Sequence, residues 1–158
     1  MKMRLRTLWR VPVYCLIASW ISFYATVYLA RFFFVVKSVG ADGVTNVSAD
    51  PVRSTIFHAV LFLAVLLIGG LWAFRSMTRA EIAVSAAIMT AVYLSVVLFQ
   101  LNLPDFSLSW SLMLAKFQNW PGIASSLLIR LTDQLNFSVI AASFVPLLFI
   151  PFGQRRAA

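Results

Sequence analysis

Hydrophobic residues along this chain gather into four long runs, rather than into an alternating or a clearly amphipathic pattern. A helix needs about 20 mainly apolar residues to cross a bilayer. Four segments meet this requirement, at about residues 11–34, 55–74, 80–101 and 133–152. The pattern predicts an all-α integral membrane protein, a four-helix bundle in a single domain that covers residues 1–158.

The segments between these runs differ in length and polarity. Residues 37–54 form a polar connection with two glycines, two aspartates and a proline, whereas residues 75–79 form a short basic turn. Residues 102–132 form a long connection that is about half apolar. Within the fourth run, Pro146 removes one helix hydrogen bond, so we expect a bend there.

The long connection at residues 102–132 requires its own interpretation. Residues 107–112 alternate like a strand, but residues 113–117 do not continue the alternation. A lone strand at a membrane would leave backbone groups unpaired. We therefore favour a short interfacial helix with Trp110, Phe117 and Trp120 at the level of the lipid headgroups, followed by a helix with Pro121 in its first turn. A re-entrant segment or a fifth span over residues 107–131 is the alternative.

The composition excludes a soluble globular domain. Hydrophobic residues make up 61% of the 158 residues and charged residues 11%, and the mean hydropathy is +0.89. Soluble domains are nearer half apolar and a quarter charged. Disorder is excluded as well, because disordered chains combine low hydrophobicity with high charge.

The basic residues predict an orientation in the membrane. The formal net charge is +8, but the charges lie at the ends of the apolar runs and form no basic stripe, so we expect no nucleic-acid partner. With four spans, one side holds the basic residues of segments 2–10, 75–79 and 155–156. Cytoplasmic loops are enriched in Lys and Arg. The chain is therefore predicted to have both termini in the cytoplasm and two outer loops, residues 37–54 and 102–132.

Arginine outnumbers lysine ten to three. This ratio is typical of GC-rich bacterial genomes, because most arginine codons are GC-rich. The apolar run behind the basic N-terminus is longer than the 7–15 residues of a signal peptide, which indicates an uncleaved anchor. We expect a multi-pass protein of the bacterial inner, or cytoplasmic, membrane.

Small residues recur every four positions in two of the predicted spans. Such rows allow close approach of two helices in lipid, and their spacing suits a right-handed crossing. They indicate packing between the first and third spans, or an interface with another protomer or membrane protein. The two rows are Ala18, Ser22, Thr26 and Ala30 in the first span, and Ala83, Ala87, Ala91 and Ser95 in the third.

Polar residues cluster near the predicted outer ends of the spans. If the spans form a bundle, these groups surround one outward-facing pocket that could hold an anionic headgroup or a small polar ligand. Arg31 and Asp133 are then the natural ion pair. The interpretation without a ligand is that these side chains reach from the spans to the interface. The candidate pocket residues are Arg31, His58, Gln100 and Asp133.

No catalytic or metal-binding pattern is present in the sequence. The lone Cys15 and the lone His58 exclude a Cys/His metal cluster within one chain. A catalytic His58 needs a nucleophile or carboxylate nearby, and the helical neighbours four residues away are Ser54 and Phe62. We therefore expect no cofactor, no bound metal and no enzyme activity.

The leading hypothesis is a non-enzymatic membrane protein, an accessory or scaffold subunit that packs against another membrane protein or itself within the lipid bilayer. The alternative is a small transporter, or a lipid- or small-molecule-binding component, that uses the outward pocket.

Overall fold

The structure is a computed structural model, and it describes residues 7–39, 45–102 and 108–154. The N-terminal basic residues Lys2, Arg4 and Arg6, and the tail residues Arg155 and Arg156, lie outside the described residues. The elements, in chain order, are α1 (Arg10–Phe33), β1 (Val35–Val39), β2 (Thr45–Ala49), α2 (Pro51–Ile68), the π-helix η2 (Gly69–Ala73), α3 (Arg79–Asn102), α4 (Leu108–Phe117), α5 (Asn119–Thr132), α6 (Leu135–Ala142) and the 3₁₀-helix η3 (Val145–Phe152).

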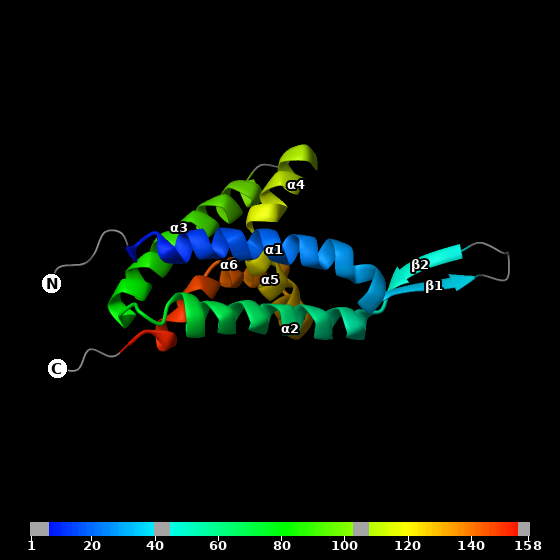
Figure 1. Cartoon of the computed structure of the whole chain (residues 1–158). Helices are drawn as coiled ribbons and strands as arrows, with labels where there is room; N and C mark the ends of the chain where they lie inside the picture. Colours follow the sequence, from blue (N-terminus) through cyan, green and yellow to red (C-terminus); the bar gives the residue numbers. More distant parts are fainter. Residues whose placement is uncertain (1–6, 40–44, 103–107, 155–158) are drawn as a thin grey trace.

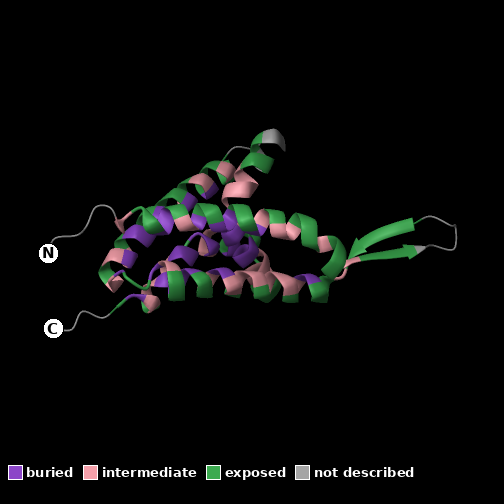
Figure 2. Cartoon of the chain, viewed as in Figure 1, coloured by how far each residue is buried: buried purple, intermediate pink, exposed green. Residues whose placement is uncertain are grey.

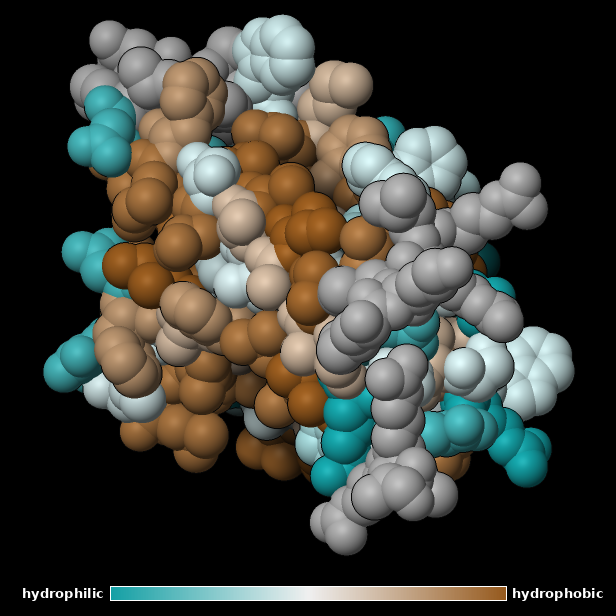
Figure 3. Space-filling model, turned by 90° about the vertical axis from the view of Figure 1, so that its left-hand side faces the viewer, coloured by the Kyte–Doolittle hydropathy of each residue, from teal (hydrophilic) through white to brown (hydrophobic). Residues whose placement is uncertain are grey.

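Three of the predicted spans are confirmed as helices that are long and apolar enough to cross a membrane, and a bent pair of helices could supply a fourth. The three are Arg10–Phe33, Pro51–Ala73 and Arg79–Asn102. Large apolar side chains cover much of the surface in Figure 3, with hydrophilic side chains gathered toward the margins of that view. The most exposed include Trp72, Leu131 and Phe32. A surface of this kind suits a lipid environment rather than water.

The helices do not all run in one direction. Figure 1 shows α1 and α2 along the length of the molecule, with the β-hairpin beyond one of their ends and the start of α1 and the end of α2 at the other. Helices α4 and α5 run across this direction, and α5 packs against both α1 and α2. The crossing brings segments that are far apart in the sequence into one core, as the buried residues in Figure 2 show.

The first of the two predicted outer loops, residues 37–54, is more regular than the sequence predicts. Instead of a polar loop, it contains an antiparallel hairpin in which Val35 pairs with Ala49 and Val39 with Thr45. Asp50 then accepts hydrogen bonds from the backbone N–H groups of Val52 and Arg53, at 2.9 and 3.1 Å. Because this N-cap precedes Pro51, helix α2 begins four residues earlier than the predicted span.

The described part of the second predicted outer loop contains two helices, α4 and α5, and the predicted position of Trp120 is wrong. Trp110 on α4 is 60% exposed, but Trp120 at the start of α5 is 0% exposed. Its ring stacks on Phe62 of α2 and Phe149 of η3, with centroid separations of 5.5 and 5.3 Å. Burial against two aromatic rings from other elements places this side chain in the core rather than at the headgroups.

The fourth apolar run is broken, as Pro146 predicts. Helix α6 ends at Ala142, η3 begins at Val145, and the two are bent by 41°. Pro146 lies within the first two positions of η3, where its missing N–H leaves no helix bond unmade. The run begins at a sharp turn, because Asp133 has a left-handed backbone with φ 54°.

The core is closed by aromatic rings against two glycines of η2. Phe74 and Phe149 lie 4.8 Å apart, edge to face. A Cβ atom on Gly69 would come within 2.6 Å of the Phe149 ring, and one on Gly70 within 2.4 Å of the Phe152 ring. No larger residue fits at either position without displacing these rings, so the glycines allow η3 to pack directly on the α2–η2 backbone.

Candidate functional site

The structure does not join the four predicted outward pocket residues to one another. The Arg31 guanidinium lies 4.6 Å from the centre of the Phe32 ring. His58 is half-buried, and its Nδ1 lies 3.5 Å from Ser54 Oγ. Gln100 lies near the end of α3, which leads to α4 rather than to the β-hairpin (Figure 1). No hydrogen bond, ion pair or ring contact connects any two of Arg31, His58, Gln100 and Asp133, all of which are described residues.

The ion pair expected between Arg31 and Asp133 is absent. Among the described residues, the one salt bridge joins Arg53 and Asp50, with Nε and Oδ2 3.4 Å apart. Both of these side chains belong to the start of α2, and Asp133 is exposed at the α5–α6 turn. The outward pocket therefore has no geometric support in this conformation.

The two rows of small residues face different ways. In α1, Ala18 and Ser22 are buried, and Thr26 and Ala30 are half-buried, so this row packs inside the chain. In α3, Ala83 is half-buried, whereas Ala87, Ala91 and Ser95 are exposed. The buried face of α3 is instead formed by other residues: Ile82, Ser85, Ala86, Met89, Thr90, Tyr93 and Val97. The two rows do not pack against each other, and the α3 row lies on the outside of the chain.

An apolar groove continues the outward face of α3. It lies between α3 and α4, has a volume of about 560 Å³, and is lined by Ser95, Val96, Phe99, Trp110 and Leu114. Ser95 Oγ donates a hydrogen bond to Ala91 O within the same helix, at 2.8 Å. Among the described lining residues, the hydroxyl of Ser95 is thus satisfied by its own helix backbone, and these residues present a face suited to apolar contacts.

A serine at the centre of the molecule connects three helices. Ser19 Oγ on α1 accepts a hydrogen bond from the Trp120 backbone N–H of α5, at 3.3 Å. The same oxygen lies 3.4 Å from the hydroxyl of Tyr93 on α3. All three residues are buried. Their bonds fix the start of α5 where it crosses α1, because an unpaired N–H at this depth would be costly.

A second, smaller cavity lies beside this crossing, between α3, α5 and α6. Its volume is about 120 Å³. The polar residues around it are Tyr93, Gln118, Ser125 and Ser143, and the other lining residues are Val97, Pro121, Gly122, Val139 and Ala142. Gln118 Nε2 is buried and has no hydrogen-bond partner among the described residues.

The surroundings of His58 give no basis for assigning a reaction. Its contacts are Ser54 and the rings of Phe34 and Phe57. A serine–histidine pair is only part of a nucleophilic site, which also needs a group that orients the base. Within the described residues, no carboxylate contacts His58, and no group of three or more His, Cys, Asp or Glu side chains could hold a metal.

The crossing at Ser19 and the cavity beside it were not predicted from the sequence. Both depend on α5 passing through the core, which the apolar pattern did not predict. One signal was available: the polar pair Gln118–Asn119 directly precedes the bulky, rigid Trp120–Pro121. A polar pair next to residues that favour burial is consistent with a helix break in a core.

Comparison of the chain with protein-family models, with curated proteins and with solved structures gave no match.

Proposed function

We propose that this chain is a non-enzymatic accessory or scaffold subunit of a membrane complex, and that the outward face of α3 binds a transmembrane helix of a partner. The observation that carries the proposal is the row Ala87, Ala91 and Ser95 on α3, which is exposed in the part of the chain that the structure describes. Small residues on a lipid-facing surface allow a second helix to approach closely.

The extent of the face matches a helix partner. Ala83 and Ser95 are twelve residues apart, which corresponds to about 18 Å along α3. The groove at Phe99 and Trp110 then offers space for larger side chains of the partner. The exposed residues beside the row, Val84, Ile88 and Val92, are apolar as well. An apolar helix would therefore contact small residues along one stretch and fill the groove beyond it.

We also propose four spans, with both termini in the cytoplasm of a bacterial cell and the chain in its inner membrane. Shortly before the proposed fourth span begins, Arg130 Nη1 of α5 donates to Pro51 O, at 3.0 Å. At the other end, Gln154 N donates to Met77 O, also at 3.0 Å. Because Pro51 and Met77 lie at opposite ends of the α2–η2 helix, the bent pair α6–η3 covers the same depth. Its two parts supply about 28 Å of helix, close to the hydrocarbon thickness of about 30 Å.

The scaffold proposal is tested by the mass of the complex that contains the chain. The complex is extracted gently from its own membrane and measured by native mass spectrometry, for the wild type and for Ala87→Leu and Ala91→Leu. Leucine at either position keeps the surface apolar but prevents close helix approach. We expect the wild-type protein to be detected in a complex whose mass exceeds the monomer mass of 17.7 kDa. In both variants, the fraction of the protein found in that complex should fall at least tenfold.

The matched control is Ala80→Leu, which makes the same change at an exposed position of α3 outside the row. It should leave the complex intact. Copies with two different tags distinguish self-association from binding to another protein. A wild type found only as a monomer, or complexes unchanged in Ala87→Leu and Ala91→Leu, would contradict the proposal.

The alternative function, a transporter or ligand-binding component, is not proposed on Arg31, His58, Gln100 and Asp133, because no contact joins them.

A further inference from the structure

Two grooves adjoin on one face of α1. The first has a volume of about 360 Å³ and lies between the start of α1 and the end of η2. The second has a volume of about 250 Å³ and lies between α1 and Phe117 at the end of α4. Ile17 lines both grooves, so we treat them as one feature, the α1 track. Its residues on α1 recur at intervals of three and four positions and include Arg10, Val13, Tyr14, Ile17, Trp20 and Ile21.

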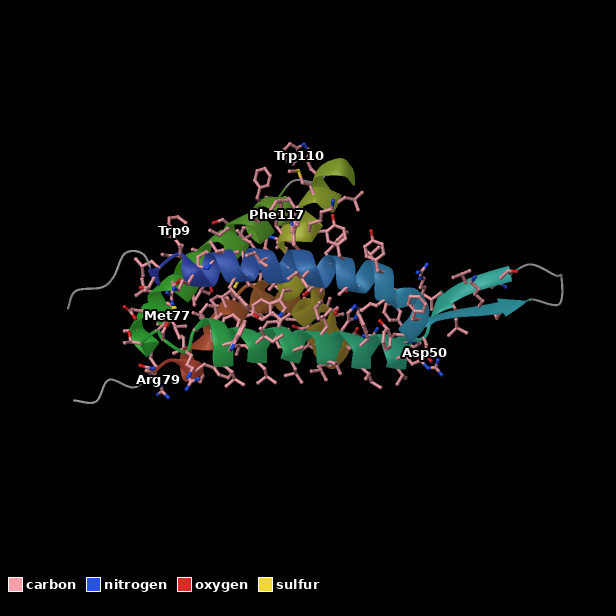
Figure 4. The ribbon with its side chains drawn as sticks, viewed as in Figure 1. Trp9, Asp50, Met77, Arg79, Trp110 and Phe117 are labelled. Carbon is pink, nitrogen blue, oxygen red and sulfur yellow. The ribbon has the colours of Figure 1, made fainter. Side chains whose placement is uncertain are left out.

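The length of the α1 track matches one leaflet of a membrane. Arg10 and Ile21 are eleven residues apart, which corresponds to about 16 Å along the helix. Half the hydrocarbon thickness of a bilayer is about 15 Å. Figure 4 shows Trp9, which lines the first groove, at the start of α1, and Phe117, which lines the second, further along the helix. The track therefore extends from one interface to about the middle of the bilayer, as an acyl chain does.

Beyond Arg10, the walls of the α1 track suit an acyl chain. Val13, Ile17 and Ile21 are apolar and exposed on α1. The hydroxyl of Tyr14 donates to Val65 O at 2.6 Å, so it is satisfied within the chain. Apolar side chains along a lipid-facing groove can contact a hydrocarbon chain over its whole length.

The interfacial end of the α1 track is positively charged. Arg10 Nη1 donates to Ser76 Oγ at 2.9 Å, which holds the guanidinium at the turn between η2 and α3. Arg75, the residue before Ser76, is exposed and adds a second positive charge. Within the described residues, no carboxylate forms an ion pair with either arginine, whereas Arg53 at the opposite end of the molecule pairs with Asp50. The end of the track therefore lacks a counter-charge.

We propose that the α1 track binds one anionic phospholipid, in the leaflet on the side of the turn between η2 and α3. Its phosphate accepts hydrogen bonds from the Arg10 guanidinium, and one acyl chain lies along Val13, Ile17 and Ile21. Guanidinium groups form strong, charge-assisted hydrogen bonds with phosphate, and basic pockets between membrane helices are known to hold anionic headgroups. The proposal is independent of the outward face of α3, so either one can fail without the other.

The test measures the affinity of single lipids for the full-length protein. The protein in nonionic detergent micelles is titrated with dioleoylphosphatidylglycerol, and bound lipid is counted by native mass spectrometry. Dioleoylphosphatidylcholine is the control probe, because it has the same acyl chains but no net charge. We expect the first phosphatidylglycerol to bind at least tenfold more tightly than phosphatidylcholine. Arg10→Gln should weaken phosphatidylglycerol binding about tenfold, through loss of a charge-assisted hydrogen bond.

The matched control for the charge is Arg31→Gln, which removes an arginine from the other end of α1. It should leave the affinity for phosphatidylglycerol unchanged. Equal affinities of the wild type for the two lipids, or equal phosphatidylglycerol affinities in the wild type and Arg10→Gln, would overturn the proposal.

A second pair of variants tests the position of the acyl chain. Val13→Trp places a large ring in the first groove and should weaken binding of phosphatidylglycerol at least tenfold. Val27→Trp makes the same exchange at an exposed position of α1 outside the track, and should have no effect. Val13→Trp leaves the bond between Arg10 and Ser76 in place, so the test remains decisive if Arg10→Gln does not fold. Equal affinities in Val13→Trp and Val27→Trp would refute the assigned chain position.

A free phosphate compound is the other possible source of the same headgroup contacts. Glycerol phosphate carries the phosphate without acyl chains, and it should not displace phosphatidylglycerol when both are at equal concentration. Displacement by glycerol phosphate under these conditions would mean that the arginines form a site for soluble anions, and would refute a lipid site.

Discussion

Ser19 and Ser22 show how one hydroxyl can stabilise the core while its neighbour does not. Both serines are buried on α1 with 0% exposure. Ser19 Oγ accepts from the Trp120 N–H and contacts the Tyr93 hydroxyl. Ser22 Oγ has no hydrogen-bond partner among the described residues. The two serines are therefore equally buried, but only the Ser19 hydroxyl is expected to stabilise the fold.

The two serines give a matched pair of substitutions. We expect Ser19→Ala to lower the free energy of unfolding by about 1 kcal/mol, because the buried N–H of Trp120 loses its acceptor. Ser22→Ala should be neutral or slightly stabilising, because it removes a polar group that is buried without a partner. The measurement is unfolding by a denaturing detergent in mixed micelles. Equal losses in the two variants would show that the Ser19 bonds contribute nothing beyond volume.

At the scale of elements, the Arg79 side chain adds to the backbone hydrogen bonds that attach the C-terminal segment to the α2–α3 turn. Arg79 Nε donates to Gly153 O at 3.3 Å, and Nη2 donates to Pro151 O at 3.4 Å. A Cβ on Gly153 would come within 2.7 Å of the Arg79 backbone nitrogen, so the two segments are in close contact. Figure 4 shows Arg79 and Met77 at the end of the molecule opposite the β-hairpin.

Removing this side chain should loosen the attachment without unfolding the bundle. We expect Arg79→Ala to increase the hydrogen-exchange rate of the Gly153 and Gln154 amides about tenfold, which corresponds to about 1.4 kcal/mol for the two lost hydrogen bonds. The control is Arg75→Ala, four residues earlier in the α2–α3 turn, since Arg75 is exposed and has no hydrogen bond to a described residue. Unchanged exchange in Arg79→Ala would mean that backbone contacts alone hold the segment.

The elements also differ in how well the sequence predicts them. Helices α1 and α3 are evident from long apolar runs, which in lipid have no alternative to helix. The hairpin at residues 35–49 is missed because its strands are only five residues long and two strands alone are marginally stable. The core position of α5 is missed because it depends on contacts between Trp120, Phe62 and Phe149, which no local pattern encodes.

The candidate sites, like the elements, are predictable only as far as they depend on local sequence. The sequence locates the small-residue row of α3, but which face is buried depends on where α5 and η3 pack. The outward pocket was inferred from the ends of parallel spans. It has no support because α3 ends at α4, away from the β-hairpin end of α1 and α2 (Figure 1). Long-range packing thus decides the sites even where the helices themselves are predictable.

At the scale of the whole molecule, the proposed four spans make a specific prediction about sidedness. Figure 4 shows Asp50 near the β-hairpin end, and Met77 and Arg79 at the opposite end. Ser38 lies in the hairpin, Ser76 in the α2–α3 turn, and Gln154 bonds to Met77. The basic residues of the turn favour the cytoplasm for that end. Ser38 should therefore face outward, and Ser76 and Gln154 should face inward.

Single cysteines in a Cys15→Ser background test this arrangement. A membrane-impermeant maleimide added to intact cells should label Ser38→Cys, but label Ser76→Cys and Gln154→Cys only after the cells are opened. Gln134→Cys, before α6, should behave like Ser38→Cys, because Arg130 holds that end of α5 at Pro51. Labelling of Gln134→Cys only in opened cells, together with outward labelling of Ser38→Cys, would mean that α6 and η3 do not cross the membrane. The reverse labelling pattern at all four sites would be consistent with four spans in the opposite orientation. In either orientation, Gln154 and Ser76 should be labelled from the same side, because the bond from Gln154 N to Met77 O holds the C-terminal segment at the α2–α3 turn.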